Sequence, residues 1–222
     1  MVNSVAVTSL PKTAPSPIKV NNNNIEAVEE YIYLGQRFSL LDKGQEKEIQ
    51  RRINAGWAAF ANHKDIFKSN MPLSLKRKVY NACVLPAITY GSETWTLTAA
   101  LENKLRVAQR KMERSILGIS LIDKKTNKWI RDQTRVKDVI ETVKRIKWRW
   151  AGHVARMQDN RWTIRITDWT PRYGKRNRGR PATRWRDEID RFSGHPTWKR
   201  QAQDRQKWKE HAEAFVQSVE QE

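Results

Sequence analysis

The sequence of 222 residues has only one cysteine, Cys83, so the chain cannot close an internal disulfide. This cysteine usage fits a reducing compartment. The N-terminus also lacks the charged-then-apolar layout of a secretory signal. Runs of about 20 apolar residues are absent, so no membrane-spanning helix and no membrane partner are predicted. We therefore expect an intracellular protein, either nuclear or cytoplasmic.

Sequence patterns that commonly carry catalysis are missing as well. The four histidines are scattered and, with one cysteine, form no zinc pattern. No G-x-S-x-G, P-loop or G-x-G-x-x-G motif occurs. Two acidic pairs are adjacent in sequence: we expect Glu29-Glu30 to be a solvated edge and Asp187-Glu188 to pair with Arg184 and Arg191. We predict no metal, no cofactor, no catalytic residue and no small-molecule substrate.

What the chain has in excess is positive charge. Its 43 lysines and arginines exceed its 24 acids, which gives a formal net charge of +19 and a pI near 10.3. Such a charge opposes compaction unless a polyanion relieves it. RNA or DNA is therefore the expected partner.

The apolar core is predicted to centre on residues 73–117. In the last part of this stretch, Leu105, Met112 and other apolar residues recur at helical spacing. Arginines fill the other faces of that helix, and we expect them to contact nucleic acid: Arg106, Arg110 and Arg114.

Glycine, proline and helix-capping residues predict where the elements of the first half begin and end. The leader lacks periodicity and is expected to be unstructured. A strand pair with its bend at Gly35 follows. The first helix contains Gly56, and we expect a neighbouring element to approach the backbone closely there. Pro72 starts the next helix, and Pro86 must kink or end it. The predicted spans are a strand pair at 31–38, a helix at about 45–67, a helix from about 73, and a helix from Thr98 as N-cap to Gly118.

The second half is predicted to be helical and rich in tryptophan. Seven of the ten tryptophans lie after residue 140; each one either anchors a core or stacks on a base, and the core role is favoured. A polar connection at 120–127 is the expected subdomain boundary. The predicted spans are a short helix near Trp129, an amphipathic helix at 136–157, a strand or a helix at 161–169, and helices at about 182–192 and 197–219.

The stretch from Pro171 to Arg186 is the strongest binding signal, with seven Lys/Arg and no acid. Arginine forks match phosphate oxygens, and Tyr173 and Trp185 lie beside the charges. A solvated linker or a nuclear-localisation patch would look similar, whereas membrane binding is disfavoured because the stretch has no apolar face. The predicted nucleic-acid contacts here are Arg172, Lys175, Arg176, Arg178, Arg180 and Arg184.

Six segments of the chain form a recognisable set. They are Y-L-G at 33–35, L-P-A-I-T-Y-G-S-E-T-W-T-L at 85–97, Q-R-K-M-E-R-S-I-L-G at 109–118, W-R-W-A-G-H-V-A-R-M at 148–157, R-G-R-P-A-T-R-W at 178–185 and A-Q-D-R-Q-K-W at 202–208. In this order they resemble the C-terminal part of a non-LTR retrotransposon endonuclease–reverse transcriptase of the RTE type. The resemblance covers about residues 28–216.

This resemblance implies a mainly α fold in which Tyr33, Leu34 and Gly35 form a primer grip that holds the primer 3′ end. After the leader at 1–27, whose composition predicts disorder, the resemblance implies a β-hairpin at 28–44, a helical thumb-like domain at 45–119 that grips the template–primer duplex, and a basic, Trp-rich helical domain at 120–222. The parent enzyme is an RNA-directed DNA polymerase that uses magnesium through an Asp-Asp motif in its palm domain. That motif should precede Y-L-G, but the leader contains no Asp.

We therefore expect a truncated, nucleic-acid-binding remnant that is inactive as a polymerase by itself. A piece of an active reverse transcriptase, from an incomplete gene model, would have the same sequence. The alternative is a non-enzymatic protein-interaction module that uses the amphipathic helix at 136–157 and the Trp-rich helices against a partner.

Overall fold

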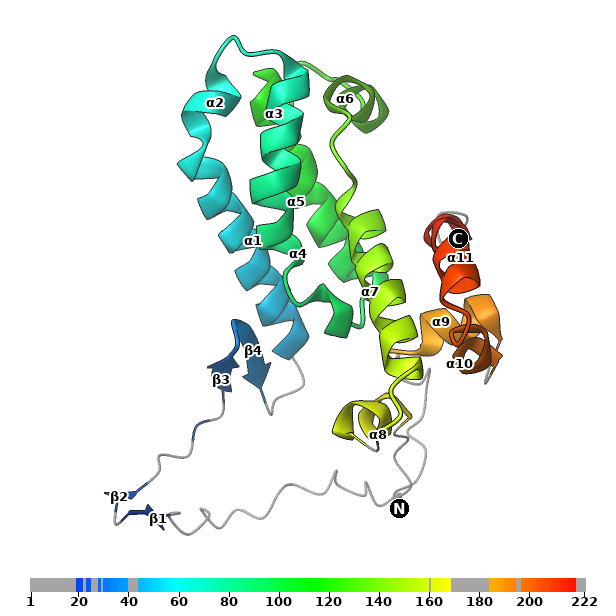
Figure 1. Cartoon of the computed structure of the whole chain (residues 1–222). Helices are drawn as coiled ribbons and strands as arrows, with labels where there is room; N and C mark the ends of the chain where they lie inside the picture. The colour runs from blue at the N-terminus through cyan, green and yellow to red at the C-terminus, as the bar shows by residue number, and fades with distance from the viewer. Residues whose placement is uncertain are drawn as a thin grey trace, which may run out of the picture.

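The chain is mainly helical, with a small antiparallel hairpin near its N-terminal end, as Figure 1 shows; this confirms the predicted fold class. Within the part of the chain that the structure describes, no helix is both long and apolar enough to cross a membrane. This computed structural model describes residues 19–21, 23–24, 28, 30–39, 44–159, 161–168, 184–194 and 197–218.

The hairpin consists of β3 (Glu30–Tyr33) and β4 (Gln36–Ser39), with Tyr33 opposite Gln36. Leu34 and Gly35 form the turn, with φ of 48° and 73°. Two consecutive positive φ angles are typical of the type I′ turn, whose twist matches that of the strands. The predicted strand pair and the bend at Gly35 are confirmed.

Among its described residues, the predicted leader forms a short strand pair. Strands β1 (Lys19–Val20) and β2 (Asn23–Asn24) pair across a turn at Asn21, where φ is 49°. Asparagine tolerates this left-handed conformation because its short polar side chain can bond locally. The prediction of a structureless leader is wrong for this short pair, and residues 1–18 lie outside the described part.

The helices of the first half form a bundle. The predicted helix at 45–67 is divided at His63, whose Nδ1 lies 2.9 Å from the carbonyl oxygen of Ala59. Pro86 does not end the following helix, because a π-helical turn precedes it and widens the backbone where the proline ring would crowd the previous turn. The elements are α1 (Gly44–Asn62), α2 (Lys64–Lys68), α3 (Leu73–Val79), the π-helical η1 (Tyr80–Val84), α4 (Leu85–Thr89), the 3₁₀-helical η2 (Ser92–Thr94) and α5 (Ala99–Leu117).

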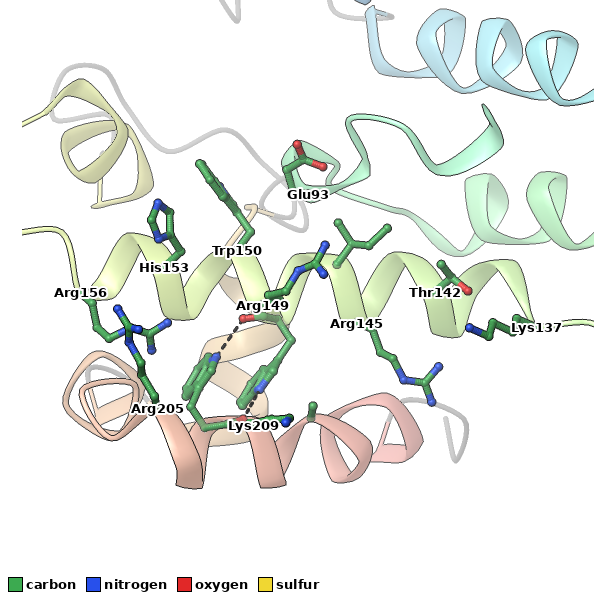
Figure 2. A pocket seen from close by; sticks show the side chains of 14 residues that line it. Glu93, Lys137, Thr142, Arg145, Arg149, Trp150, His153, Arg156, Arg205 and Lys209 are labelled. Atoms are coloured by element: carbon green, nitrogen blue, oxygen red, sulfur yellow. Dashed lines mark hydrogen bonds between the residues drawn. The ribbon is translucent and has the colours of Figure 1, made fainter. Parts of the chain in front are cut away.

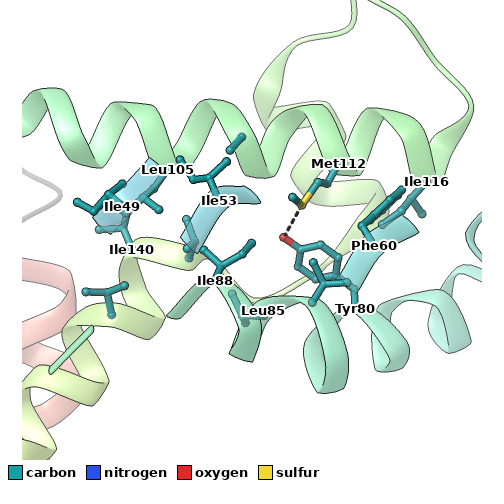
Figure 3. Close-up of a cluster of buried hydrophobic side chains, with 14 of the residues drawn as sticks. Ile49, Ile53, Phe60, Tyr80, Leu85, Ile88, Leu105, Met112, Ile116 and Ile140 are labelled. Atoms are coloured by element: carbon teal, nitrogen blue, oxygen red, sulfur yellow. Dashed lines mark hydrogen bonds between the residues drawn. The ribbon is translucent and has the colours of Figure 1, made fainter. Parts of the chain in front are cut away.

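Both predicted ends of α5 are confirmed. The Thr98 side chain accepts a hydrogen bond from the Leu101 N–H, and Gly118 closes the helix with φ of 67°. The close approach predicted at Gly56 is also present, since a Cβ there would lie 2.3 Å from Ile88 Cγ1. Glycine therefore lets α1 contact α4 in the first core cluster (Figure 3).

The second half contains six helices within the described residues. The segment at 161–169, for which a strand and a helix are both predicted, forms the helix α8. The last predicted helix is interrupted between Gln201 and Arg205. The elements are α6 (Asn127–Thr134), α7 (Val139–Ala155), α8 (Trp162–Asp168), α9 (Asp187–Ser193), α10 (Thr197–Gln201) and α11 (Arg205–Ser218).

Helix α7 belongs to two hydrophobic clusters. Its first turns, including Ile140 and Val143, pack with α1, α4 and α5. Further along, Trp148 and Ala151 pack with residues of α9, α10 and α11. The domain division at 119/120 stays a prediction, although the first cluster extends across it.

The centre of the second cluster is a reciprocal contact between two tryptophans. The indole N–H of Trp148 donates to the backbone carbonyl of Trp208 (2.7 Å), and the indole N–H of Trp208 donates to that of Trp148 (3.0 Å). Their rings stack 3.7 Å apart at an angle of 3°. We call this pair the tryptophan clasp. A face-to-face sandwich is not the preferred aromatic geometry, so the two hydrogen bonds stabilise it.

Arg110 corrects an expectation from the sequence. It is buried and donates to both carboxylate oxygens of Glu113 (2.6 and 2.7 Å) and to Asp138 (3.0 Å). Burial raises the pKa of Glu113, and the Arg110 guanidinium opposes that rise. The prediction that Arg110 contacts nucleic acid is therefore wrong, because its donors connect α5 to the start of α7.

Gly152→Ala is expected to lower the free energy of unfolding by about 1–3 kcal/mol, because a Cβ there would lie 2.3 Å from Trp208 Nε1 in a closely packed core. Urea denaturation followed by tryptophan fluorescence measures this change. Gly118→Asn is the control, since nothing lies within 4 Å of a Cβ at that position and asparagine accepts its left-handed backbone. Equal stability of the Gly152 variant and the native chain would contradict the clasp geometry.

Arg110→Met is expected to cost about 3–5 kcal/mol of unfolding free energy, because it leaves the buried carboxylate of Glu113 unpaired. Arg106→Met removes the same charge from the same helix. Its side chain is 43% exposed and pairs with Glu102, so it should cost less than about 1 kcal/mol. Equal losses in the two variants, measured by urea denaturation, would show that Arg110 has no special structural role.

Candidate nucleic-acid interface

A groove of about 820 Å³ runs along α7 and α11 (Figure 2). Successive contacts between these helices run in opposite directions along the chain: Arg145 of α7 pairs with Glu213 of α11, and the later residue Trp148 pairs with the earlier residue Trp208. The order continues beyond the helix ends, where Arg156 donates to Ala202. The helices are therefore antiparallel. Both rings of the tryptophan clasp line the groove, so the clasp sets the spacing of its walls.

The groove is strongly basic. Among its described lining residues, the one acid is Glu93, and six are lysines or arginines: Lys137, Arg145, Arg149, Arg156, Arg205 and Lys209. Arg145 is compensated, because it donates to both oxygens of Glu213 (2.9 and 2.6 Å). These hydrogen bonds raise the pKa of Arg145 further. The other five cations form no ion pair with any acid in the described part of the chain.

Arg156 and Arg205 place two like charges together at one end of the groove. Arg156 donates through Nη1 to the carbonyl of Ala202 (2.5 Å), a neutral partner. Its Nε is buried and has no hydrogen-bond partner within the described residues. Burial, and then the charge of Arg205, lowers the pKa of Arg156. An anion between the two side chains would relieve both effects.

Aromatic rings lie on another side of α7. Figure 2 shows Trp150 and His153 projecting from α7 on the side opposite to Arg156, Arg205 and Lys209. The ring centroids of Trp150 and His153 are 5.4 Å apart. The lined space therefore extends from the basic side of α7, which faces α11, round to an aromatic side that faces away from α11.

The arginines predicted on α5 are not part of this groove. Arg106 pairs with Glu102 (3.2 Å), and Arg114 donates to the Asn127 side chain (2.9 Å). Arg110 is buried, as described above. None of the three lines the groove.

Of the predicted basic stretch at 171–186, the structure describes only the end. Arg184 is exposed, whereas Arg172, Lys175, Arg176, Arg178 and Arg180 lie outside the described residues. Trp185 is half-buried, and its indole N–H donates to the Glu93 carbonyl (2.6 Å). This supports a packing role for Trp185.

The acidic pair at 187–188 is only partly as predicted. Asp187 accepts from the backbone N–H of Arg184 (2.7 Å), but Glu188 pairs with Lys147 of α7 (2.7 Å). Lys147 is buried, which lowers its pKa, and Glu188 counteracts this effect. The prediction that Glu188 pairs with Arg184 or Arg191 is corrected, because α9 presents this carboxylate to a buried cation.

The three predicted primer-grip residues form the tip of the hairpin. Tyr33 is half exposed and Leu34 is 75% exposed. The Tyr90 hydroxyl donates to the Leu34 carbonyl (2.8 Å), and Arg52 donates to the Gly35 carbonyl (2.8 Å). The turn is thus fixed to the helical bundle, although it contributes nothing to the groove.

Glu48 holds this arrangement in place. It is buried and accepts from Arg51 (2.7 Å), from Arg52 (3.1 Å) and from the backbone N–H of Arg37 in β4 (3.0 Å). One carboxylate therefore joins α1 to the hairpin. A two-stranded hairpin is marginal alone, so these bonds matter for its stability.

The residues that line the groove were not among the nucleic-acid contacts predicted from the sequence. Arg149, Trp150, Arg156, Arg205 and Lys209 were not identified as a site because α11 lies about 60 residues beyond the facing part of α7. One signal was present: polar positions 142, 145, 149, 153 and 156 recur at helical spacing opposite the apolar stripe.

The described residues do not fit a magnesium site. No group of three or more histidines, cysteines or acids among them could hold a metal ion. Polymerase chemistry requires carboxylates that converge on a metal ion, and the described residues do not provide such a group.

Comparison with known proteins gives one informative match. No protein-family model and no solved structure matches the chain. An uncharacterized transposon-derived protein of Caenorhabditis elegans is 38% identical over 173 residues, which cover 76% of this chain. The chain spans 62% of the length of that relative. This similarity indicates a transposable-element origin.

Proposed function

We propose that the chain is a nucleic-acid-binding C-terminal fragment of a retrotransposon reverse transcriptase, and that its role is to grip a template–primer rather than to add nucleotides. Two findings support this proposal. The relative is transposon-derived, and the motifs at 33–35, 85–97 and 148–157 resemble those of the enzyme.

The observation that carries the proposal is the basic groove. Five of its lysines and arginines have no acidic partner within the described residues: Lys137, Arg149, Arg156, Arg205 and Lys209. Like charges held along one groove repel each other and raise the energy of the unbound protein. Phosphates that follow the groove would neutralise these charges and release counterions.

The protein-interaction alternative requires an accessible apolar stripe on the helix at 136–157. In the structure, Val139, Ile140 and Val143 are buried in the first cluster, and Trp148 and Ala151 are buried in the second. Most of that stripe is therefore core and cannot receive a partner helix without unfolding, although Ile146 and Trp150 of the stripe are half-buried and line the groove. The basic face of the same helix is the part that remains accessible.

Binding is tested with a fluorescein-labelled RNA–DNA hybrid that carries a single-stranded template overhang. Fluorescence anisotropy should show affinity falling by orders of magnitude between about 50 and about 200 mM salt. The double variant Arg149→Gln/Lys209→Gln should bind roughly tenfold more weakly and flatten the log–log salt slope by about 2.

The matched control is Lys64→Gln/Lys68→Gln, which removes the same charge from exposed positions on α2. We expect a much smaller change in affinity and slope from this variant, because α2 does not line the groove. Affinity that ignores salt, or equal losses from both double variants, would refute the groove as the binding site.

A further inference from the structure

The two sides of the groove differ in what they can bind. Arg156, Arg205 and Lys209 supply guanidinium and ammonium donors suited to phosphate oxygens. Trp150 and His153, on the other side of α7, supply flat rings suited to nucleobase faces. A ligand that fills the groove must therefore present phosphates and unstacked bases at the same time.

Trp150 is the tryptophan of the groove that is available for stacking. Trp148 and Trp208 also line it, but their rings stack on each other at 3.7 Å, and each donates its indole N–H to the backbone carbonyl of the other. Trp150 is only half-buried, and the His153 ring lies beside it with its plane tilted by 40°. A flat ligand on Trp150 would not disturb the core.

A duplex does not match this arrangement. In double-stranded nucleic acid, each base face is covered by its stacked neighbours, so only phosphates and groove edges are offered to a protein. A duplex would contact the basic side and leave Trp150 unused. A single strand can lay its backbone on the cations and turn a base onto the ring.

The size of the groove agrees with a short strand segment. Its volume of about 820 Å³ lies in the range of sites that enclose a small organic ligand. The Arg156–Arg205 pair lies at one end of the groove, which both side chains line. Such a donor pair favours a phosphate at a defined position.

We infer that the groove, which extends from α11 round α7, is a site for single-stranded nucleic acid, with a phosphate between Arg156 and Arg205 and a base of the same strand stacked on Trp150. This inference rests on the proposed nucleic-acid binding and assigns the groove to the unpaired part of the ligand. The base identity is not read, because every base has a face that can stack.

The test compares three fluorescein-labelled probes of equal length by anisotropy: an oligo(dT) strand, an abasic strand with the same phosphates, and a blunt duplex. The oligo(dT) strand should bind about tenfold or more tightly than the abasic strand, because only the former can stack. An oligo(U) strand should behave like oligo(dT).

Four variants of the full chain locate the effect. Trp150→Ala should remove the difference between the oligo(dT) and abasic strands, whereas Trp150→Phe, which keeps a ring, should retain most of it. Trp162→Ala is the matched control, since Trp162 is 72% exposed on α8 and does not line the groove. Arg205→Gln should weaken the oligo(dT) and abasic strands alike and flatten their salt slopes by about 1.

The outcomes separate this inference from the proposed function. Binding in which the abasic strand equals oligo(dT), or in which Trp150→Ala weakens the duplex as much as the single strand, overturns the single-strand site and leaves nucleic-acid binding standing. Absence of binding to any probe overturns both. Unchanged urea denaturation of Trp150→Ala verifies that a lost difference reflects stacking and not unfolding.

Discussion

The tryptophan clasp is the contact on which the second half of the molecule depends. Trp148 and Trp208 are 60 residues apart in the chain, and each donates its buried indole N–H to the backbone carbonyl of the other. A buried donor without a partner costs about 1–3 kcal/mol of stability, so displacing either ring would destabilise the packing of both helices. Gly152 makes the approach possible, because any side chain there would overlap the Trp208 indole. The distance between α7 and α11, and with it the groove, follows from this contact.

Charge is divided between two uses in this chain. Some cations are structural: Arg110 joins α5 to α7, Arg52 joins α1 to the hairpin, and Lys147 joins α7 to α9. Each of these has a buried or half-buried carboxylate as partner. The groove cations Arg149 and Lys209 have no such partner within the described residues. The net charge alone therefore says little about where a polyanion binds, whereas the pairing of each cation does.

The sequence was informative where structure is local. The N-cap at Thr98, the left-handed end at Gly118 and the turn at Gly35 each depend on a few neighbouring residues, and all three were predicted. The motifs also indicated an origin in a transposable element, which the relative supports. Periodicity identified the apolar stripe of α7, because burial imposes a 3.6-residue repeat whatever the partner.

What the sequence could not supply was the pairing between distant segments. Arg110 had the spacing of a surface residue, but it is buried and donates to Asp138, which lies 28 residues later in the chain. Glu188 was assigned to neighbouring arginines because the partner, Lys147, lies 41 residues earlier. The groove escaped notice for the same reason, since its walls come from two helices that approach only through the clasp. The helix type at Pro86 depended on a widened turn that no residue pattern signals.

Helix α7 has a consequence for how such a sequence can be inherited. Ile140 completes the core built by α1, α4 and α5, while Trp148, two turns later, completes the core built with α11. A recombination junction between residues 143 and 148 would leave each core with residues from one parent, whereas a junction just before residue 139 would separate α7 from the α1, α4 and α5 residues that it packs against. When elements exchange segments, α7 should therefore be divided between its two cores more readily than it is separated from either of them.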